Sequence, residues 1–461
     1  MFHVEQISAL LAVPAIAITA MAQDESAQIP VPTLAFPIST ENTTAQSECQ
    51  AGLLDLLMGW DESAQNHFQQ AVEADNTCAF AYAGLCLTNK SDTQARTALK
   101  EILSQATLLP HETFYIECLL KLAAGHYTDA CNDFISRSNQ YRADKIAAVW
   151  AVILLHSLDI SYDPITAEAS DYQTEALNRI TKLCEQYPDD ALIAYARAYI
   201  EQSAPQISGD AVASAVQAAE SFSTHPVPQH LLGHLLSRTQ NHEQSVGYFN
   251  KAALLASQRG LPLEDSVQWW KSRICEATAL WNAGKKKDAT TLCQKLNALP
   301  LDEERRHTPV GILRRWEVNL LPLRFLVAEQ NAQHKAVAAA SQTATPKTPW
   351  KHQDYVLHVR DCLRAALSAQ AKAKQGKPAD AQRSLQLAES AKEILDSSYD
   401  AIASESPLLI THFFRAQEAC TIAINQAKAQ LYPHTREIWI QNAESAKKLP
   451  VLMLPPVIPA P

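Results

Sequence analysis

The chain has 461 residues, of which 47% are hydrophobic and only 11 are glycine. This composition favours helices and leaves little glycine for phosphate-binding loops, so we expect a mostly α-helical protein. The formal net charge of -10, from 49 acidic and 39 basic residues, gives no general attraction to a polyanion, and we expect no nucleic-acid partner.

Residues 1–22 have the pattern of a signal peptide. An apolar stretch from Ile7 to Ala20 leads into Ala20-Met21-Ala22, which offers the small residues that a signal peptidase requires. The stretch is shorter than the roughly 20 apolar residues needed to span a bilayer. The residues before it include no lysine or arginine, unlike most signal peptides. We expect an exported protein, periplasmic or secreted, with no stable membrane insertion of the mature chain; a cytosolic chain with an apolar start is the alternative.

Residues 23–44 are rich in proline, serine and threonine and lack helical periodicity, so we expect a flexible linker. From Ala45 onward a spacing recurs, first as Gly59, Ala64, Phe68 and Ala71. It returns as Gly125, Ala130 and Phe134, as Ala176, Ile180 and Leu183, as Ser245, Phe249 and Ala252, as Gly284, Ala289, Cys293 and Leu296, and as Gly376, Ala381, Leu385 and Ala388. Such recurrence is typical of stacked helical hairpins, because each hairpin buries its apolar faces only against its neighbours.

The first of these sets, together with Leu232-Gly233 followed by Ser245, Phe249 and Ala252, resembles the tetratricopeptide repeat (TPR) family. The resemblance implies an all-α, right-handed superhelical solenoid of stacked antiparallel hairpins. We expect a TPR-like array over residues 45–300, degenerate TPR-like hairpins over 301–448 and a proline-rich tail over 449–461. The run from Pro188 to Ala252 is similar to a subgroup of bacterial TPR proteins that carry a histidine-bearing stretch like Pro228-Gln229-His230-Leu231.

In the TPR family, fixed positions of the first helix of each repeat line the concave groove. The resemblance places there Tyr195 and Tyr199, then His230, His234 and Arg238, with Tyr115 and Trp281 at matching positions. Tyrosine, tryptophan and arginine dominate interaction hot spots. The implied function is a non-catalytic scaffold that binds a protein or peptide segment in this groove.

His230 and His234 also allow a second interpretation. Two histidines four residues apart on one helix have the spacing of metal ligands, although a third ligand is needed and no H-E-x-x-H motif is present. The alternative is therefore a metal-binding protein or a hydrolase-type enzyme centred on this pair. A third possibility is a structural spacer whose polar groove residues have no partner. Nucleophile-elbow, P-loop and dinucleotide motifs are absent from the sequence, so we expect no enzyme activity and no cofactor.

Ten cysteines are scattered from Cys49 to Cys420, without a C-x-x-C motif. Cys118 with Cys131, and Cys275 with Cys293, each fall on the two arms of an expected hairpin and could form disulfides. Buried free thiols where helices pack closely are the equally supported alternative.

Overall fold

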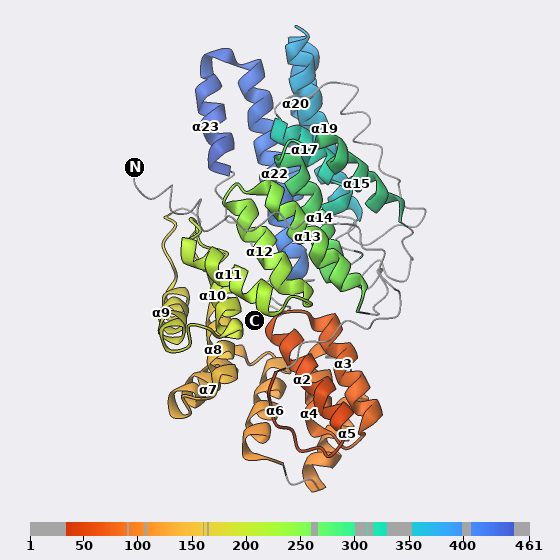
Figure 1. The fold of residues 1–461 in the computed structure, drawn as a ribbon. Helices are drawn as coiled ribbons and strands as arrows, with labels where there is room; N and C mark the ends of the chain where they lie inside the picture. Colours follow the sequence, from red (N-terminus) through yellow and green to blue (C-terminus); the bar gives the residue numbers. More distant parts are fainter. Residues whose placement is uncertain are drawn as a thin grey trace.

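The protein is an all-α array of antiparallel helices, seen in a computed structural model (Figure 1). The structure describes residues 34–89, 92–105, 108–159, 161–163, 166–259, 266–299, 311, 317–329, 353–398 and 407–446. Within these ranges every regular element is a helix, and the β-type pairing is a single isolated bridge between Tyr162 and Ala169. The expected class, an all-α solenoid of stacked hairpins, is therefore confirmed.

The helices fall into a long first series and a shorter second one. The first series is α2 (Thr43–Leu57), α3 (Asp61–Ala74), α4 (Ala79–Thr88), α5 (Thr93–Gln105), α6 (Pro110–Ala123), α7 (Tyr127–Gln140), α8 (Lys145–Ser157), α9 (Asp171–Gln186), α10 (Ala191–Glu201), α11 (Gly209–Ser221), α12 (Pro226–Arg238), α13 (His242–Ser257), α14 (Val267–Asn282) and α15 (Lys286–Ala298). The second is α17 (Leu321–Glu329), α19 (Gln353–Lys374), α20 (Pro378–Ser397), α22 (Pro407–Leu431), the short helix η3 (Pro433–Thr435) and α23 (Arg436–Ala446). Successive helices pack as hairpins, such as α2 with α3 and α12 with α13, and each hairpin packs on the next.

Glycine closes several of these hairpins at the predicted positions. Gly59, Gly125, Gly284 and Gly376 have φ angles of 74°, 85°, 78° and 71°. This left-handed region is open to glycine at little steric cost and commonly ends a helix. The turn between α12 and α13 reaches the same region with Gln240, whose φ is 66°. The glycine spacing in the sequence therefore marked real hairpin turns.

Small residues allow neighbouring helices to approach around a buried aromatic ring. Phe68 on α3 is fully buried, and its ring lies between Gly52 on α2 and Gly84 on α4. A Cβ atom added to Gly52 would lie 2.9 Å from this ring, and one added to Gly84 would lie 2.5 Å from it. Phe249 on α13 sits in the same way against Gly233 on α12, at 3.0 Å. These glycines are needed for close packing and not for a turn.

We expect Gly84→Ala to lower the free energy of unfolding by about 1–3 kcal/mol, because the added methyl group overlaps the Phe68 ring and forces it to move. Gly247→Ala on α13 is the matched control, since a Cβ there meets no atom within 4 Å. Alanine is also the better helix former, so the control should be neutral or stabilising by up to about 1 kcal/mol. Denaturant unfolding followed by circular dichroism measures both, and equal effects would contradict the close-packing role.

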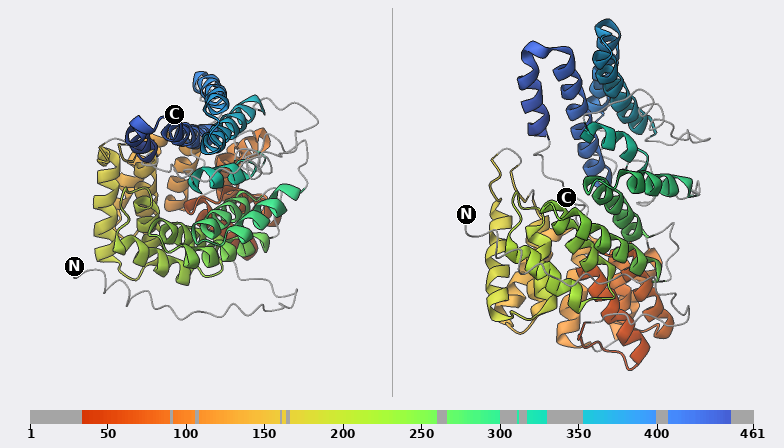
Figure 2. Two further views of the ribbon diagram at one scale, coloured as in Figure 1. Left: turned by 90° about the horizontal axis from the view of Figure 1, so that it is seen from above. Right: turned by 45° about the horizontal axis from the view of Figure 1, so that its top comes forward.

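The first series of helices curves until its later hairpins meet its first one, as the view from above shows (Figure 2). We call the resulting set of contacts the ring closure. Tyr195 Oη on α10 donates to the Met58 carbonyl oxygen at 2.9 Å. His225 Nε2 at the start of α12 donates to Asp55 Oδ1 at 2.8 Å. The backbone N–H of Gln268 on α14 donates to Glu62 Oε1 at 3.1 Å. The partners lie 137, 170 and 206 residues apart in sequence. The side of the array that carries Tyr195, His225 and Gln268 is therefore covered here by its own first hairpin.

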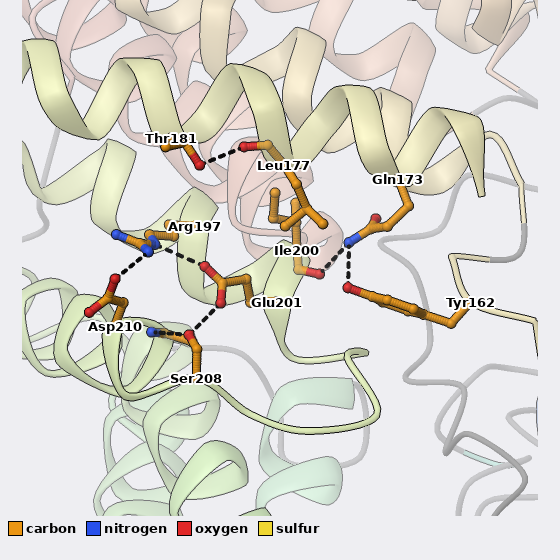
Figure 3. A network of polar contacts seen from close by, with 10 residues as sticks. Tyr162, Gln173, Leu177, Thr181, Arg197, Ile200, Glu201, Ser208 and Asp210 are labelled. Atoms are coloured by element: carbon orange, nitrogen blue, oxygen red, sulfur yellow. Dashed lines mark hydrogen bonds and ion pairs between the residues drawn. The ribbon is translucent and has the colours of Figure 1, made fainter. Parts of the chain in front are cut away.

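Polar side chains also link consecutive helices on the way round (Figure 3). Gln173 on α9 is fully buried and its amide donates to the Ile200 carbonyl oxygen of α10 at 3.0 Å. Arg197 on α10 bonds Glu201 on the same helix and Asp210 on α11, both at 2.8 Å. These bonds fix the orientation of α9 and α11 relative to α10, in addition to the apolar packing between them.

The described apolar side chains form two buried clusters that meet on α17. The first includes helices from α2 to α15 and reaches Leu321 and Phe325. The second includes Leu323 and Val327 of the same short helix, together with α19, α20 and α22. One face of α17 therefore belongs to the first series of helices and the other face to the second. No helix among the described residues is both long and apolar enough to cross a membrane.

Residues 34–42 form an extended arm that packs against the array before α2 begins. Phe36 and Ile38 are 4% and 5% exposed, and Asn42 caps α2 by accepting from the backbone N–H groups of Thr44 and Ala45. This arm belongs to the predicted flexible linker 23–44, and it differs from that expectation because its alternate apolar residues are buried. The predicted signal peptide 1–22, the linker residues 23–33 and the tail 449–461 lie outside the described residues.

Candidate functional site

A cavity of about 860 Å³ lies where α12, α13 and α14 face α17 and α22. Its lining includes His234 and Arg238 from α12, Trp281 from α14, Arg324 and Phe325 from α17 and Glu418 from α22. The cavity therefore combines residues of the repeat array with residues of the C-terminal helices. Its position follows from α17, which joins the two buried clusters.

An aromatic pair forms one wall of the cavity. The rings of Trp281 and Phe325 are stacked, with centroids 4.4 Å apart and an angle of 11° between the planes. The Lys286 ammonium lies 5.5 Å from the Trp281 ring and forms an ion pair with Glu329 at the end of α17. Stacking and ion pair together connect α17 to α14 and α15.

Charged groups of both signs reach the cavity. Arg238 is half-buried and donates to the Gln202 carbonyl oxygen and, at 3.4 Å, to that of Pro205. Burial lowers the pKa of its guanidinium. Arg324 pairs with the buried carboxylate of Glu317, while its Nε and Nη2 atoms are buried and make no hydrogen bond within the described part of the chain. These two atoms are donors whose hydrogen-bonding capacity is not used within the described part of the chain.

The cavity brings together three of the seven residues predicted for the groove. His234, Arg238 and Trp281 all line it and are all partly exposed. Their role in binding a partner stays a prediction, and the structure places them where such a role is physically possible.

His230 lies behind this surface and is 6% exposed. Its Nδ1 is 3.1 Å from Ser272 Oγ, and its ring is 5.2 Å from that of Phe249. Burial, helped by the positive charges of His234 and Lys271, lowers the pKa of His230 to about 3. The side chain is therefore a neutral core group near physiological pH, and a partner has no direct access to it in this conformation.

The depressed pKa of His230 predicts a loss of stability in acid. Its pKa is about 3 in the folded protein and 6.5 as an ordinary histidine, so below pH 6.5 the unfolded chain takes up a proton that the folded chain excludes. The contribution is complete above pH 6.5 and falls by up to about 1.4 kcal/mol per pH unit on acidification. His230→Asn should flatten this dependence. Denaturant midpoints of both proteins from neutral pH downward measure it, and parallel curves would contradict it.

Tyr195 and Tyr199 have stacked rings with centroids 6.0 Å apart. Tyr195 is 1% exposed because it takes part in the ring closure, and Tyr199 is partly exposed and packs edge-on against His156 at 5.4 Å. Burial raises the pKa of both hydroxyls, so neither ionises near physiological pH. In this conformation Tyr195 contacts the first hairpin of its own chain.

Tyr115 is fully buried under the arm. Its ring meets that of Phe36 edge-on at 4.9 Å, and its hydroxyl donates to Asp144 Oδ1 at 2.6 Å. Burial and the Asp144 charge raise the pKa of this hydroxyl. Tyr115 therefore contacts an extended segment of its own chain, and its predicted role in binding a partner stays a prediction.

Sequence reasoning missed a buried polar cluster at the ring closure. Asp55 is 1% and His225 0% exposed, and His67 lies between Asp55 and Glu48. His225 caps α12, where its Nδ1 accepts from the backbone N–H of Val227, so the proton resides on Nε2 and points at Asp55. Burial by itself raises the pKa of Asp55, but the hydrogen bond from His225 lowers it below its ordinary value. A lone aspartate in the apolar run Leu53 to Leu57 was the available signal.

The metal interpretation gains no support from the described residues, among which no group of three or more His, Cys, Asp and Glu could hold a metal ion. All ten cysteines lie in the described part of the chain and none of them forms a disulfide there, including the pairs Cys118 with Cys131 and Cys275 with Cys293. Burial raises the pKa of Cys131 to about 11 and that of Cys293 to about 12, so these two thiols stay protonated and weakly reactive.

These features define an all-α protein built of stacked antiparallel helical hairpins. No protein-family model matches the chain, and no curated protein matches it. Among solved structures, the crystal structure of the yeast Tom70 aligns with 13% sequence identity and a TM-score of 0.34, over 88% of this chain and 89% of that chain. At this level of similarity the fold assignment depends on the helices and turns described above.

Proposed function

We propose that this protein is an exported, non-catalytic scaffold that holds a segment of another protein in the cavity between α12, α14, α17 and α22. The observation that carries the proposal is the convergence of His234, Arg238 and Trp281 on one cavity. Aromatic and arginine side chains in a partly enclosed site supply most of the free energy in protein interfaces.

The chemistry of the cavity favours a segment with an apolar anchor and an acceptor group. The stacked Trp281–Phe325 wall offers an apolar surface for an aromatic or aliphatic side chain. The buried donors of Arg324 suit a backbone carbonyl or a carboxylate of the same segment. A bound segment would satisfy these donors while its side chain covers the aromatic wall.

Panning a random peptide library on the immobilised full-length chain tests this function, because the library samples many segments and the natural partner need not be identified first. We expect enriched peptides to lose at least about tenfold in affinity for Trp281→Ala and for Arg238→Ala, in line with hot-spot losses of about 2 kcal/mol. Tyr172→Ala on α9 is the matched control, because Tyr172 is exposed and lies outside the cavity lining. Peptides that bind all three variants equally, or no enrichment at all, would contradict the proposal.

Export is the part of the proposal that comes from residues 1–22, whose apolar stretch ends in the small-residue pattern Ala20-Met21-Ala22. We expect the mature protein to begin at Gln23. Intact mass measurement of the protein recovered from the periplasm or medium of an expressing bacterium decides this, with cytosolic protein of full mass as the contrary result.

A further inference from the structure

The arm packs on the array in the manner of a bound peptide. Its side chains alternate, with Phe36 and Ile38 buried while Ala35, Pro37 and Ser39 are exposed. This period of two is that of an extended chain lying on a surface. The sequence therefore presents one apolar face to the array and a polar or proline face to solvent.

The Phe36 ring fills an aromatic site between α4 and α6. It lies 5.2 Å from Phe80, 5.3 Å from His111 and 4.9 Å from Tyr115, with the last two in edge-on geometry. Edge-on aromatic contacts are favourable beyond the burial of area, and they fix the orientation of the central ring. The site is therefore selective for a flat ring at this position of the segment.

Side chains of the array bind the backbone of the arm on both sides of Ile38. The carbonyl oxygen of Phe36 accepts from Gln50 Nε2 at 2.8 Å, and the carbonyl oxygen of Pro37 accepts from His111 Nε2 at 2.8 Å. The backbone N–H of Ser39 donates to Glu112 Oε2 at 2.9 Å. The Ser39 hydroxyl accepts from the Leu109 N–H at 2.9 Å. The three bonds to backbone groups carry no sequence information and would form with any segment of matching shape, whereas the bond from the Leu109 N–H requires a hydroxyl side chain at the position of Ser39. The alternate side-chain sites then supply specificity.

Among the residues of this surface, Glu112 sets the most specific requirement for a bound segment. Glu112 is 1% exposed, and a buried carboxylate is costly without a hydrogen-bond donor. The backbone N–H of Ser39 supplies that donor. The surface therefore favours a segment that brings an N–H group to this point, next to an apolar residue.

We propose that this surface, formed by Phe80, His111, Glu112 and Tyr115 and here called the arm groove, is a second peptide-binding site. It accepts an extended partner segment in which an aromatic residue, a proline, an aliphatic residue and a serine follow in order. The arm Phe36-Pro37-Ile38-Ser39 is a ligand of this class within the same chain and competes with the partner. This site is separate from the cavity of the proposed function, so either can fail without the other.

A synthetic fluorescent peptide with the sequence of residues 34–41, LAFPISTE, tests the arm groove in the full-length chain. We compare the wild-type chain with the double variant Phe36→Ala, Ile38→Ala, in which the internal ligand is weakened. Fluorescence anisotropy should show saturable binding to the double variant at least about tenfold tighter than to the wild type, because the wild-type groove is already occupied.

Three comparisons make the result specific. A peptide with alanine in place of Phe36 and Ile38 should not bind. Adding His111→Ala to the double variant should weaken binding of the original peptide. His111 is partly exposed and contacts both the Phe36 ring and the Pro37 carbonyl oxygen. Circular dichroism checks folding, and Ile38→Ala alone replaces the double variant if that variant is unfolded. Absence of binding to a folded arm variant, or binding that ignores His111→Ala, would show that the arm is only structural and overturn the inference.

Discussion

Asp55→Ala is expected to lower the free energy of unfolding by about 3–5 kcal/mol, because it removes one partner of a buried pair and leaves the other without an acceptor. His225 is fully buried, and its Nδ1 is engaged with the Val227 N–H, so its Nε2–H has Asp55 as its acceptor. Denaturant unfolding followed by circular dichroism measures the loss.

The matched control is Glu73→Ala on α3, an exposed acidic residue of the same hairpin, for which we expect a change below about 0.5 kcal/mol. The double variant Asp55→Ala, His225→Ala should be less destabilised than the sum of the single variants. Each single variant leaves one buried group without its partner, whereas the double variant removes both groups. If Asp55→Ala were as mild as Glu73→Ala, the Asp55–His225 contact of the ring closure would not contribute to stability.

Phe68→Ala is the second large effect that we expect, at about 3–5 kcal/mol, because the ring fills the space between two glycines and its loss leaves a cavity. The same unfolding measurement applies, with Leu387→Ala, 66% exposed on α20, as the control. In the Phe68→Ala background, Gly84→Ala should lose its own cost, since no ring remains to meet the added methyl group. Additive costs would show that the two helices are separated by something other than this ring.

Local features of the hairpins were predictable from the sequence because their causes are local. A left-handed turn favours glycine, and Gly59, Gly125, Gly284 and Gly376 occupy such turns. Likewise, Ala64 and Phe68 are buried where the recurring spacing placed them. Each depends on residues within one hairpin or its neighbour, which is the distance over which a periodic pattern carries information.

The candidate sites were predictable only in part. His234, Arg238 and Trp281 were identified from their positions in the repeats, but Arg324 and Phe325 come from α17, where the repeat pattern is degenerate. The side of the array that carries Tyr195 is covered by the first hairpin, and this depends on a small rotation per hairpin that accumulates along the array and has no local signature. For the arm, the alternation of Phe36 and Ile38 was visible, but the surrounding proline, serine and threonine favoured a linker.

The ring closure also affects how the chain reaches its fold. A linear repeat array can fold from its first unit as the ribosome releases it, because each unit needs only its neighbour. Here Glu62 bonds Gln268, which lies 206 positions later in the chain. The first hairpin therefore cannot form all of its native contacts until more than half of the polypeptide has been synthesised. Such remote pairing slows folding and leaves the early hairpins exposed during synthesis.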